Sequence, residues 1–93
     1  MPAIELVVRH SAGLHARPAA QFVKTAASFP CTITVQNLTT QKPPANAKSV
    51  LSVMTQGVVQ NTTIRVEAEG DRADEALAAL QALVDGNFGE GGH

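Results

Sequence analysis

Hydrophobic and polar residues alternate in several short segments of the chain, which is typical of strands with one buried face. The segments with this period of two are residues 3–9, 31–36 and 61–69. A fourth segment, residues 38–46, contains Pro43 and Pro44, which have no N–H group to donate to a sheet. The pattern therefore predicts three regular strands and one short strand at a sheet edge.

Between these segments the hydrophobic positions recur every three to four residues, which indicates helices with one buried stripe. The first helix is expected to begin at Arg17–Pro18, the second after an Asn46 N-cap and the third after an Asp71 N-cap. Gly57 and Gly86 are expected to end the second and third helices. The predicted buried positions are Ala19, Phe22, Val23 and Ala26, then Val50 and Val53, then Ala73, Ala76, Leu77, Leu80 and Val84.

The order of these elements, βαββαβα, limits the sheet to very few topologies. Each crossover helix joins two parallel strands and the hairpin joins antiparallel ones, so the last strand fits antiparallel between the first two. The prediction is an α+β open-faced β-sandwich of the split β-α-β type, with a four-stranded antiparallel sheet in order 1-4-2-3 and three helices on one face. We expect a single domain over residues 1–88. The glycine-rich stretch 87–93 is expected to be loose, with residues 89–93 as a flexible tail.

Composition narrows the functional classes. Hydrophobic residues make up 44% and charged residues 16% of the 93 residues, and the formal net charge is −1. This balance predicts a cytoplasmic, monomeric protein with no direct nucleic-acid binding and no membrane insertion. Cys31 is the only cysteine, which excludes an intrachain disulfide, and we expect it to be a packed core residue. No metal site is expected, since His10 and His15 lack the spacing of a helical metal pair.

The segment GLHARPAA, residues 13–20, carries the candidate chemistry. It places His15 just before a helix N-terminus, where unpaired N–H groups and the helix dipole favour an anion such as phosphate. Arg17 can bind phosphate oxygens with its guanidinium, and Gly13 gives the backbone freedom to turn the imidazole outward. Taken singly, each residue also fits an ordinary solvated loop. Together they predict a phosphoryl group held covalently on histidine. With no P-loop or carboxylate cluster for Mg²⁺ in the sequence, we expect a carrier and not an enzyme.

The segment GLHARPAAQFV resembles the active-site segment of the HPr family, the histidine-containing phosphocarriers of the bacterial phosphoenolpyruvate-dependent sugar phosphotransferase system. KSVLSVMTQG resembles the second motif of that family, and the likeness covers residues 3–86. The resemblance implies that enzyme I phosphorylates His15 on Nδ1, that the phosphoryl group passes to sugar-specific IIA domains, and that no cofactor takes part. It also implies that Arg17 and the backbone amide of Ala16 stabilise the phosphate. Ser49 matches the serine modified by an HPr kinase/phosphorylase in many bacteria.

A docking surface for several acidic partners is predicted around His15. Its expected members are Ala20, Gln21 and Lys24 on the first helix, and Lys48, Leu51, Met54 and Thr55 on the second. Core packing is the alternative for the two large hydrophobic residues of the second helix. Two other functions stay open: a regulatory paralogue acting through phosphorylated Ser49 as a corepressor of a catabolite-control transcription factor, and a carrier for a nitrogen-related or dihydroxyacetone phosphorelay.

Overall fold

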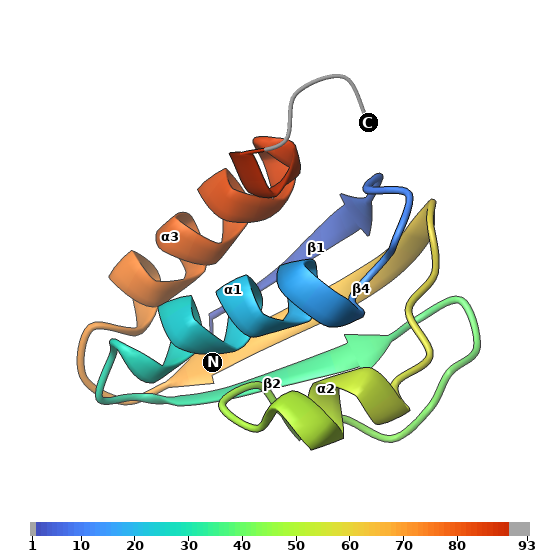
Figure 1. Cartoon of the computed structure of the whole chain (residues 1–93). Helices are drawn as coiled ribbons and strands as arrows, with labels where there is room; N and C mark the ends of the chain where they lie inside the picture. The colour runs from blue at the N-terminus through green and yellow to red at the C-terminus, as the bar shows by residue number, and fades with distance from the viewer. Residues whose placement is uncertain (1, 90–93) are drawn as a thin grey trace.

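A computed structural model, which describes residues 2–89, has one antiparallel sheet of four strands in order β1-β4-β2-β3. The strands are β1 (Ala3–Val8), β2 (Thr32–Asn37), β3 (Ala45–Asn46) and β4 (Thr62–Glu69). The helices are α1 (Ala16–Ala27), α2 (Val50–Thr55), α3 (Ala73–Asp85) and a short 3₁₀ turn, η1 (Asn87–Gly89). The three α-helices cover one face of the sheet (Figure 1), so the predicted open-faced sandwich and its strand order are confirmed.

β4 lies in the centre of the sheet and pairs with two strands, through Leu6↔Ile64 in β1 and Val35↔Val66 in β2. Every second residue of β4 is buried: Ile64, Val66 and Ala68, as the alternation predicts, and also Thr62. The opposite face is polar and carries an Arg65–Glu67 ion pair of 3.1 Å. One face of the sheet therefore belongs to the core and the other to solvent.

The core lies between the sheet and the buried stripes of α1 and α3. Both stripes contain the predicted positions: Ala19, Phe22, Val23 and Ala26 are buried in α1, and Ala73, Ala76, Leu77, Leu80 and Val84 in α3. Pro18 in α1 is buried as well, which was not predicted. Phe22 is completely buried, and burial of one such side chain contributes about 1.5–3 kcal/mol to folding. Cys31 is buried too, as expected.

Two of the predicted helix caps are wrong. Asn46 belongs to β3, and its Oδ1 accepts a hydrogen bond from the Lys48 amide at 2.9 Å, so it closes a turn before the helix. Asp71 does not cap α3, because the chain turns once more through Arg72, which has a left-handed φ of 62° and is the N-cap. Both side chains precede the true caps: Ala47 and Lys48 form a turn between Asn46 and the cap Ser49, and Asp71 is followed directly by the cap Arg72.

The later start of α2 also corrects the prediction for Val50. Val53 is completely buried as expected, but Val50 is 42% exposed. A helix of six residues presents one buried position to the sheet, and Val53 occupies it. The buried face of α2 is therefore narrower than the sequence pattern predicts.

The expectation of a loose C-terminal stretch is wrong for Asn87–Gly89. These residues form η1, and Phe88 is only 3% exposed. The Phe88 ring meets the buried His10 ring edge-on, with 5.9 Å between the ring centroids. The remainder of the predicted tail, residues 90–93, lies outside the described residues.

Candidate functional site: a histidine at the start of α1

His15 is the N-cap residue of α1, with an extended backbone (φ −130°, ψ 162°) and a half-buried side chain. The predicted helix start at Arg17–Pro18 is one residue late. N-cap side chains often accept a hydrogen bond from the first turn, but the His15 imidazole makes no such capping bond. The ring therefore stands at the positive end of a twelve-residue helix without a role in closing it.

The loop before His15 is fixed by a close backbone contact with the segment after α2. Gly13 has a φ of +63°, and a Cβ atom built on it would lie 2.1 Å from the Val58 carbonyl oxygen. The next amide, that of Leu14, donates to the same carbonyl at 3.0 Å, and the Leu14 side chain is completely buried. Glycine is required here by the close approach as well as by the backbone angle.

Ala16, directly after His15, has a φ of 51°, in the left-handed region that residues with a Cβ atom rarely enter. Such a conformation costs about 1–2 kcal/mol and is often found at functional sites. No signal in the sequence could have predicted it, because alanine has no preference for this region. Arg17 follows with an exposed side chain, so a guanidinium stands within two residues of the imidazole.

His10, for which no site role is expected, shapes the start of this loop. Its carbonyl oxygen accepts from the Gly13 amide at 2.9 Å, and its Nδ1 atom accepts from the Ala12 amide at 3.0 Å. Since the His10 ring is also packed against Phe88, the loop that leads to His15 is anchored at both of its ends.

Ser49 is the N-cap of α2, and not a first-turn residue as the sequence pattern suggests. Its Oγ atom accepts from the Ser52 amide at 3.2 Å, and its carbonyl oxygen accepts from the Val53 amide at 3.0 Å. The side chain is half-buried. A hydroxyl at this place is next to the N–H groups that begin the helix, which is the end that tolerates added negative charge.

The structure places the predicted docking residues on two neighbouring helices, α1 and α2, which contact each other. The helices run in opposite directions, so the end of α2 lies at the same end of the helical layer as the start of α1 (Figure 1). Ala20, Lys24, Leu51, Met54 and Thr55 are exposed, whereas Gln21 and Lys48 are half-buried. The Lys48 ammonium donates to the Phe29 carbonyl at 2.7 Å, which places it near the far end of α1 from His15.

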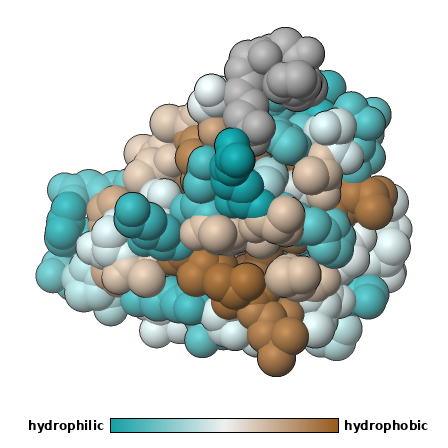
Figure 2. Space-filling view, viewed as in Figure 1, coloured by the Kyte–Doolittle hydropathy of each residue, from teal (hydrophilic) through white to brown (hydrophobic). Residues whose placement is uncertain are grey.

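An exposed hydrophobic patch covers α2. Leu51 is 75% and Met54 38% exposed, so the core-packing alternative is wrong for these two side chains. Together with Val50 they form the α2 patch, and Figure 2 shows hydrophobic side chains gathered over this helix. Val59, 59% exposed, adds a hydrophobic side chain beside Gly13 that sequence reasoning missed.

A buried polar network that sequence reasoning also missed holds α2 against the sheet. The Asn37 amide N–H donates to Gln56 Oε1 at 2.8 Å, and Asn37 Nδ2 donates to the Gln56 carbonyl at 3.0 Å. Gln56 Nε2 donates in turn to the Pro43 carbonyl at 2.7 Å. The network therefore fixes the C-terminal end of α2 and the proline-containing loop in one position.

Residues 2–89 contain neither a metal-binding cluster nor a membrane-spanning helix. No three His, Cys, Asp or Glu residues of this part of the chain come close enough to hold a metal ion. No helix among the same residues has the length and hydrophobicity needed to cross a membrane.

An open-faced sandwich with a histidine at the start of its first helix is the arrangement of a histidine phosphocarrier, a small protein that carries a phosphoryl group between larger ones. The family model described as the PTS HPr component phosphorylation site matches residues 3–85. The chain belongs to the HPr family, whose members are phosphocarriers of the phosphotransferase system and not catalysts.

Individual relatives cover nearly the whole chain. It is 37% identical over 91 residues to phosphocarrier protein HPr of Pseudomonas aeruginosa, covering 98% of this chain and 99% of the relative. A crystal structure of HPr from Thermoanaerobacter tengcongensis matches with a TM-score of 0.90 and 40% identity over 97% of this chain and 98% of that one. An HPr dimer from the same organism matches with a TM-score of 0.75, again at 40% identity, over 97% and 100% of the two chains.

Proposed function

We propose that His15 accepts a phosphoryl group from phosphorylated enzyme I and donates it to sugar-specific IIA domains during sugar uptake in the cytoplasm. The observation that carries this proposal is the position of His15 as the N-cap of α1 with an imidazole that makes no capping bond. The nucleophile is thereby held at the helix end that favours a phosphate and is not occupied by the helix itself.

The transfer needs only groups that surround this ring. The Nδ1 lone pair forms a bond to phosphorus while the bond from phosphorus to the donor breaks, and the reverse exchange passes the group to the acceptor. Arg17, exposed in the first turn, neutralises the charge of the phosphoryl oxygens, and the Ala16 amide donates to one of them. The unusual backbone of Ala16 sets the direction of this amide.

Partner binding is assigned to the α1–α2 surface. Ala20, Gln21 and Lys24 supply a polar and basic strip, and Leu51, Met54, Thr55 and Lys48 supply the neighbouring surface of the second helix. The hydrophobic α2 patch beside basic side chains suits acidic partners that bind one after another. Because donor and acceptor would use the same surface, a monomeric carrier serves them in sequence.

Ser49 is proposed as a regulatory site for an HPr kinase/phosphorylase. Its Oγ atom is already a capping group, so a phosphate there would replace a weak acceptor by a charged one at the start of α2. The added charge would lie beside the α2 patch and repel acidic partners. This modification would slow phosphoryl exchange without touching His15.

Intact-mass analysis after incubation with phosphoenolpyruvate and enzyme I tests the proposal. One added phosphoryl group that is lost in mild acid, is absent in His15→Ala and is retained in Ser49→Ala would support it. Absence of transfer, together with an acid-stable phosphate on Ser49 when a kinase and ATP are supplied, would favour the corepressor alternative. Transfer to a nitrogen-related or dihydroxyacetone acceptor, with none to sugar IIA domains, would favour the third function.

A further inference from the structure

A groove between α1 and α3 forms a second surface. It lies beside the docking strip, which is the polar and basic strip of Ala20, Gln21 and Lys24 on α1. We propose that this α1–α3 groove receives a large hydrophobic side chain of a partner protein, flanked by a carboxylate. The inference rests on the proposed function, since the partners are those that dock around His15. It extends their contact to α3, a helix to which the sequence assigns no part in binding.

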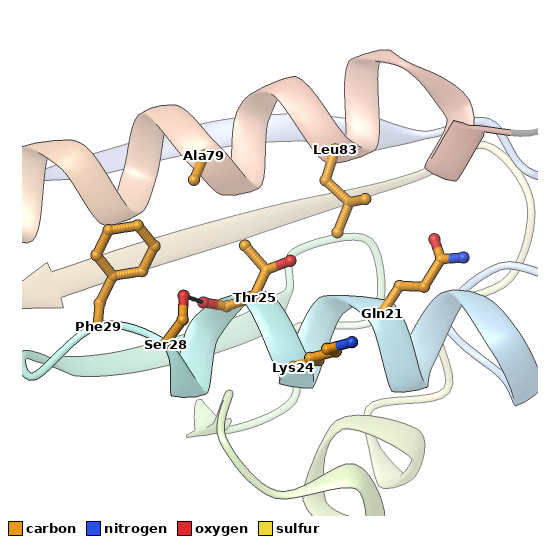
Figure 3. A pocket seen from close by; sticks show the side chains of 7 residues that line it. All are labelled: Gln21, Lys24, Thr25, Ser28, Phe29, Ala79 and Leu83. Carbon is orange, nitrogen blue, oxygen red and sulfur yellow. Dashed lines mark hydrogen bonds between the residues drawn. The ribbon is translucent and has the colours of Figure 1, made fainter.

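The groove has one hydrophobic and one polar side. Its volume is about 460 Å³, within the usual size range of a binding pocket. Phe29, Ala79 and Leu83 form the hydrophobic side, and Figure 3 shows the Leu83 and Ala79 side chains pointing from α3 toward α1. All three are only half-buried, so further hydrophobic surface could be removed from water there.

Gln21 gives the groove an unsatisfied hydrogen-bond acceptor. Its Oε1 atom is buried, yet it has no hydrogen-bond partner among residues 2–89. In Figure 3 the Gln21 amide points toward α3, at the Leu83 end of the groove. An unsatisfied buried acceptor costs about 1–3 kcal/mol, and rotation of the Gln21 amide into the groove, where a partner N–H can donate to it, would remove that cost. A peptide backbone beside an inserted side chain supplies such a donor.

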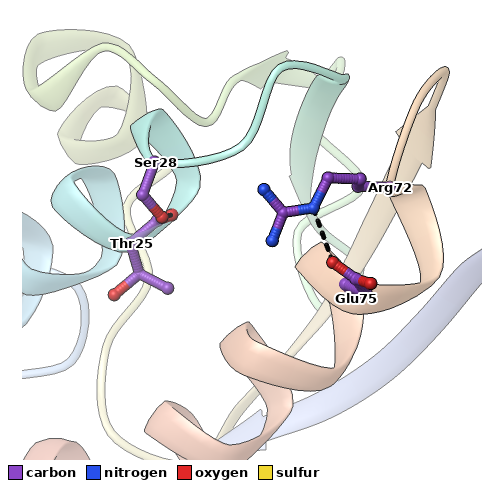
Figure 4. A network of polar contacts seen from close by, with 4 residues as sticks. All are labelled: Thr25, Ser28, Arg72 and Glu75. Carbon is purple, nitrogen blue, oxygen red and sulfur yellow. Dashed lines mark hydrogen bonds and ion pairs between the residues drawn. The ribbon is translucent and has the colours of Figure 1, made fainter.

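Basic groups stand beside the groove. Lys24 is exposed on the α1 side, midway along the groove between Gln21 and Ser28 (Figure 3). Beyond the Phe29 end, Arg72 lies over the Phe29 ring, with 5.0 Å from Cζ to the ring centroid. Figure 4 shows the Arg72 guanidinium between Ser28 and Glu75. Arg72 Nε forms an ion pair with Glu75 Oε2 at 2.6 Å. Acidic residues flanking the inserted side chain would meet Lys24 first, which gives the charge complementarity of the proposed contact.

The groove is continuous with the docking strip through α1. Gln21, Thr25 and Ser28 lie on the face of α1 turned to α3. Ala20 and Lys24 directly precede Gln21 and Thr25 in the sequence, so their side chains are turned toward α2. A protein that covers Lys24 therefore reaches the rim of the groove without changing orientation. This continuity favours a partner segment over an unrelated small molecule.

Methyl NMR of the full chain tests the groove directly. The chain is labelled at Ala and Leu methyl groups and titrated with unlabelled enzyme I and, separately, with a IIA protein. The Ala79 and Leu83 signals should shift with at least one partner, while Ala78, exposed on the same helix, should not. Shifts confined to Ala20 and Leu51 would overturn this inference and leave the proposed function intact. Shifts produced by raising the concentration of the chain alone would assign the groove to self-association and also overturn it.

A charge placed in the groove provides the matched functional test. Ala79→Glu should raise the KM of that partner's transfer reaction for this chain about tenfold with little change in kcat, because a like charge would face the incoming carboxylate. Ala78→Glu adds the same charge outside the groove and should leave both constants unchanged. Equal kinetics for the two folded variants, checked by circular dichroism, would overturn the inference. Absence of phosphoryl transfer in the unmodified chain would instead overturn the proposed function.

Discussion

Gly13→Ala tests whether the loop before His15 depends on its close contact with the segment after α2. The new Cβ atom would lie 2.1 Å from the Val58 carbonyl oxygen, so one of the two backbones must move. The positive φ of +63° costs about 1–2 kcal/mol with a side chain present. Loss of the hydrogen bond from Leu14 to Val58 adds about 1 kcal/mol. We expect the free energy of unfolding to fall by about 2–3 kcal/mol, which lowers Tm by roughly 10–20 °C.

Gly57→Ala is the matched control for this measurement. Gly57 has nearly the same φ, +65°, but the nearest atom to a Cβ there is Lys42 Nζ at 3.8 Å. Urea unfolding should therefore show only the backbone cost of about 1–2 kcal/mol. Phosphorylation of His15 by enzyme I should slow in Gly13→Ala and stay near normal in the control. Equal losses of stability in the two variants would refute the argument from the close contact.

Substitutions at three further positions probe other parts of the molecule. Asn37→Leu should lower the free energy of unfolding by about 2–4 kcal/mol in a urea titration, because removal of Nδ2 takes the donor from the buried Gln56 carbonyl and removal of Oδ1 takes the acceptor from the Thr40 amide; a loss below about 1 kcal/mol contradicts this. Ser49→Ala should cost about 1 kcal/mol in the same assay, whereas Ser49→Asp, which keeps an acceptor at the N-cap, should cost less; equal losses would argue against the cap. Leu51→Glu should leave Tm unchanged, since the side chain is 75% exposed, but should raise the KM of enzyme I for this chain; an unchanged KM excludes Leu51 from docking to enzyme I.

The sheet could be predicted because each strand is marked by its own hydrophobic alternation, and because the connections between the strands allow few strand orders. Alternation identifies β1 and β4, the proline pair limits β3 to two residues, and connection rules then leave a single strand order. The position of His15 was predictable for a similar reason, since Pro18 fixes the start of α1 to within a residue.

Features that depend on contacts between distant segments could not be predicted in this way. The caps at Asn46 and Asp71 failed because each competes with a turn that only the folded chain requires. The α1–α3 groove is formed by two helices that are adjacent in space but separated in sequence by β2, β3, α2 and β4. Phe88 looked like part of a loose tail because its burial depends on His10, almost a whole chain length away.

β3 also affects which edge of the sheet could pair with a second copy of this chain. Beside β2 the sheet ends in a two-residue strand preceded by Pro43 and Pro44, which offer no N–H groups to an incoming strand. Edge-to-edge aggregation on this side is therefore disfavoured. Within residues 2–89, no strand pairs with the outer edge of β1, which has six residues and a single charged side chain, Glu5. Sheet extension by a second molecule would accordingly be expected along β1, on the side of the sheet away from α2.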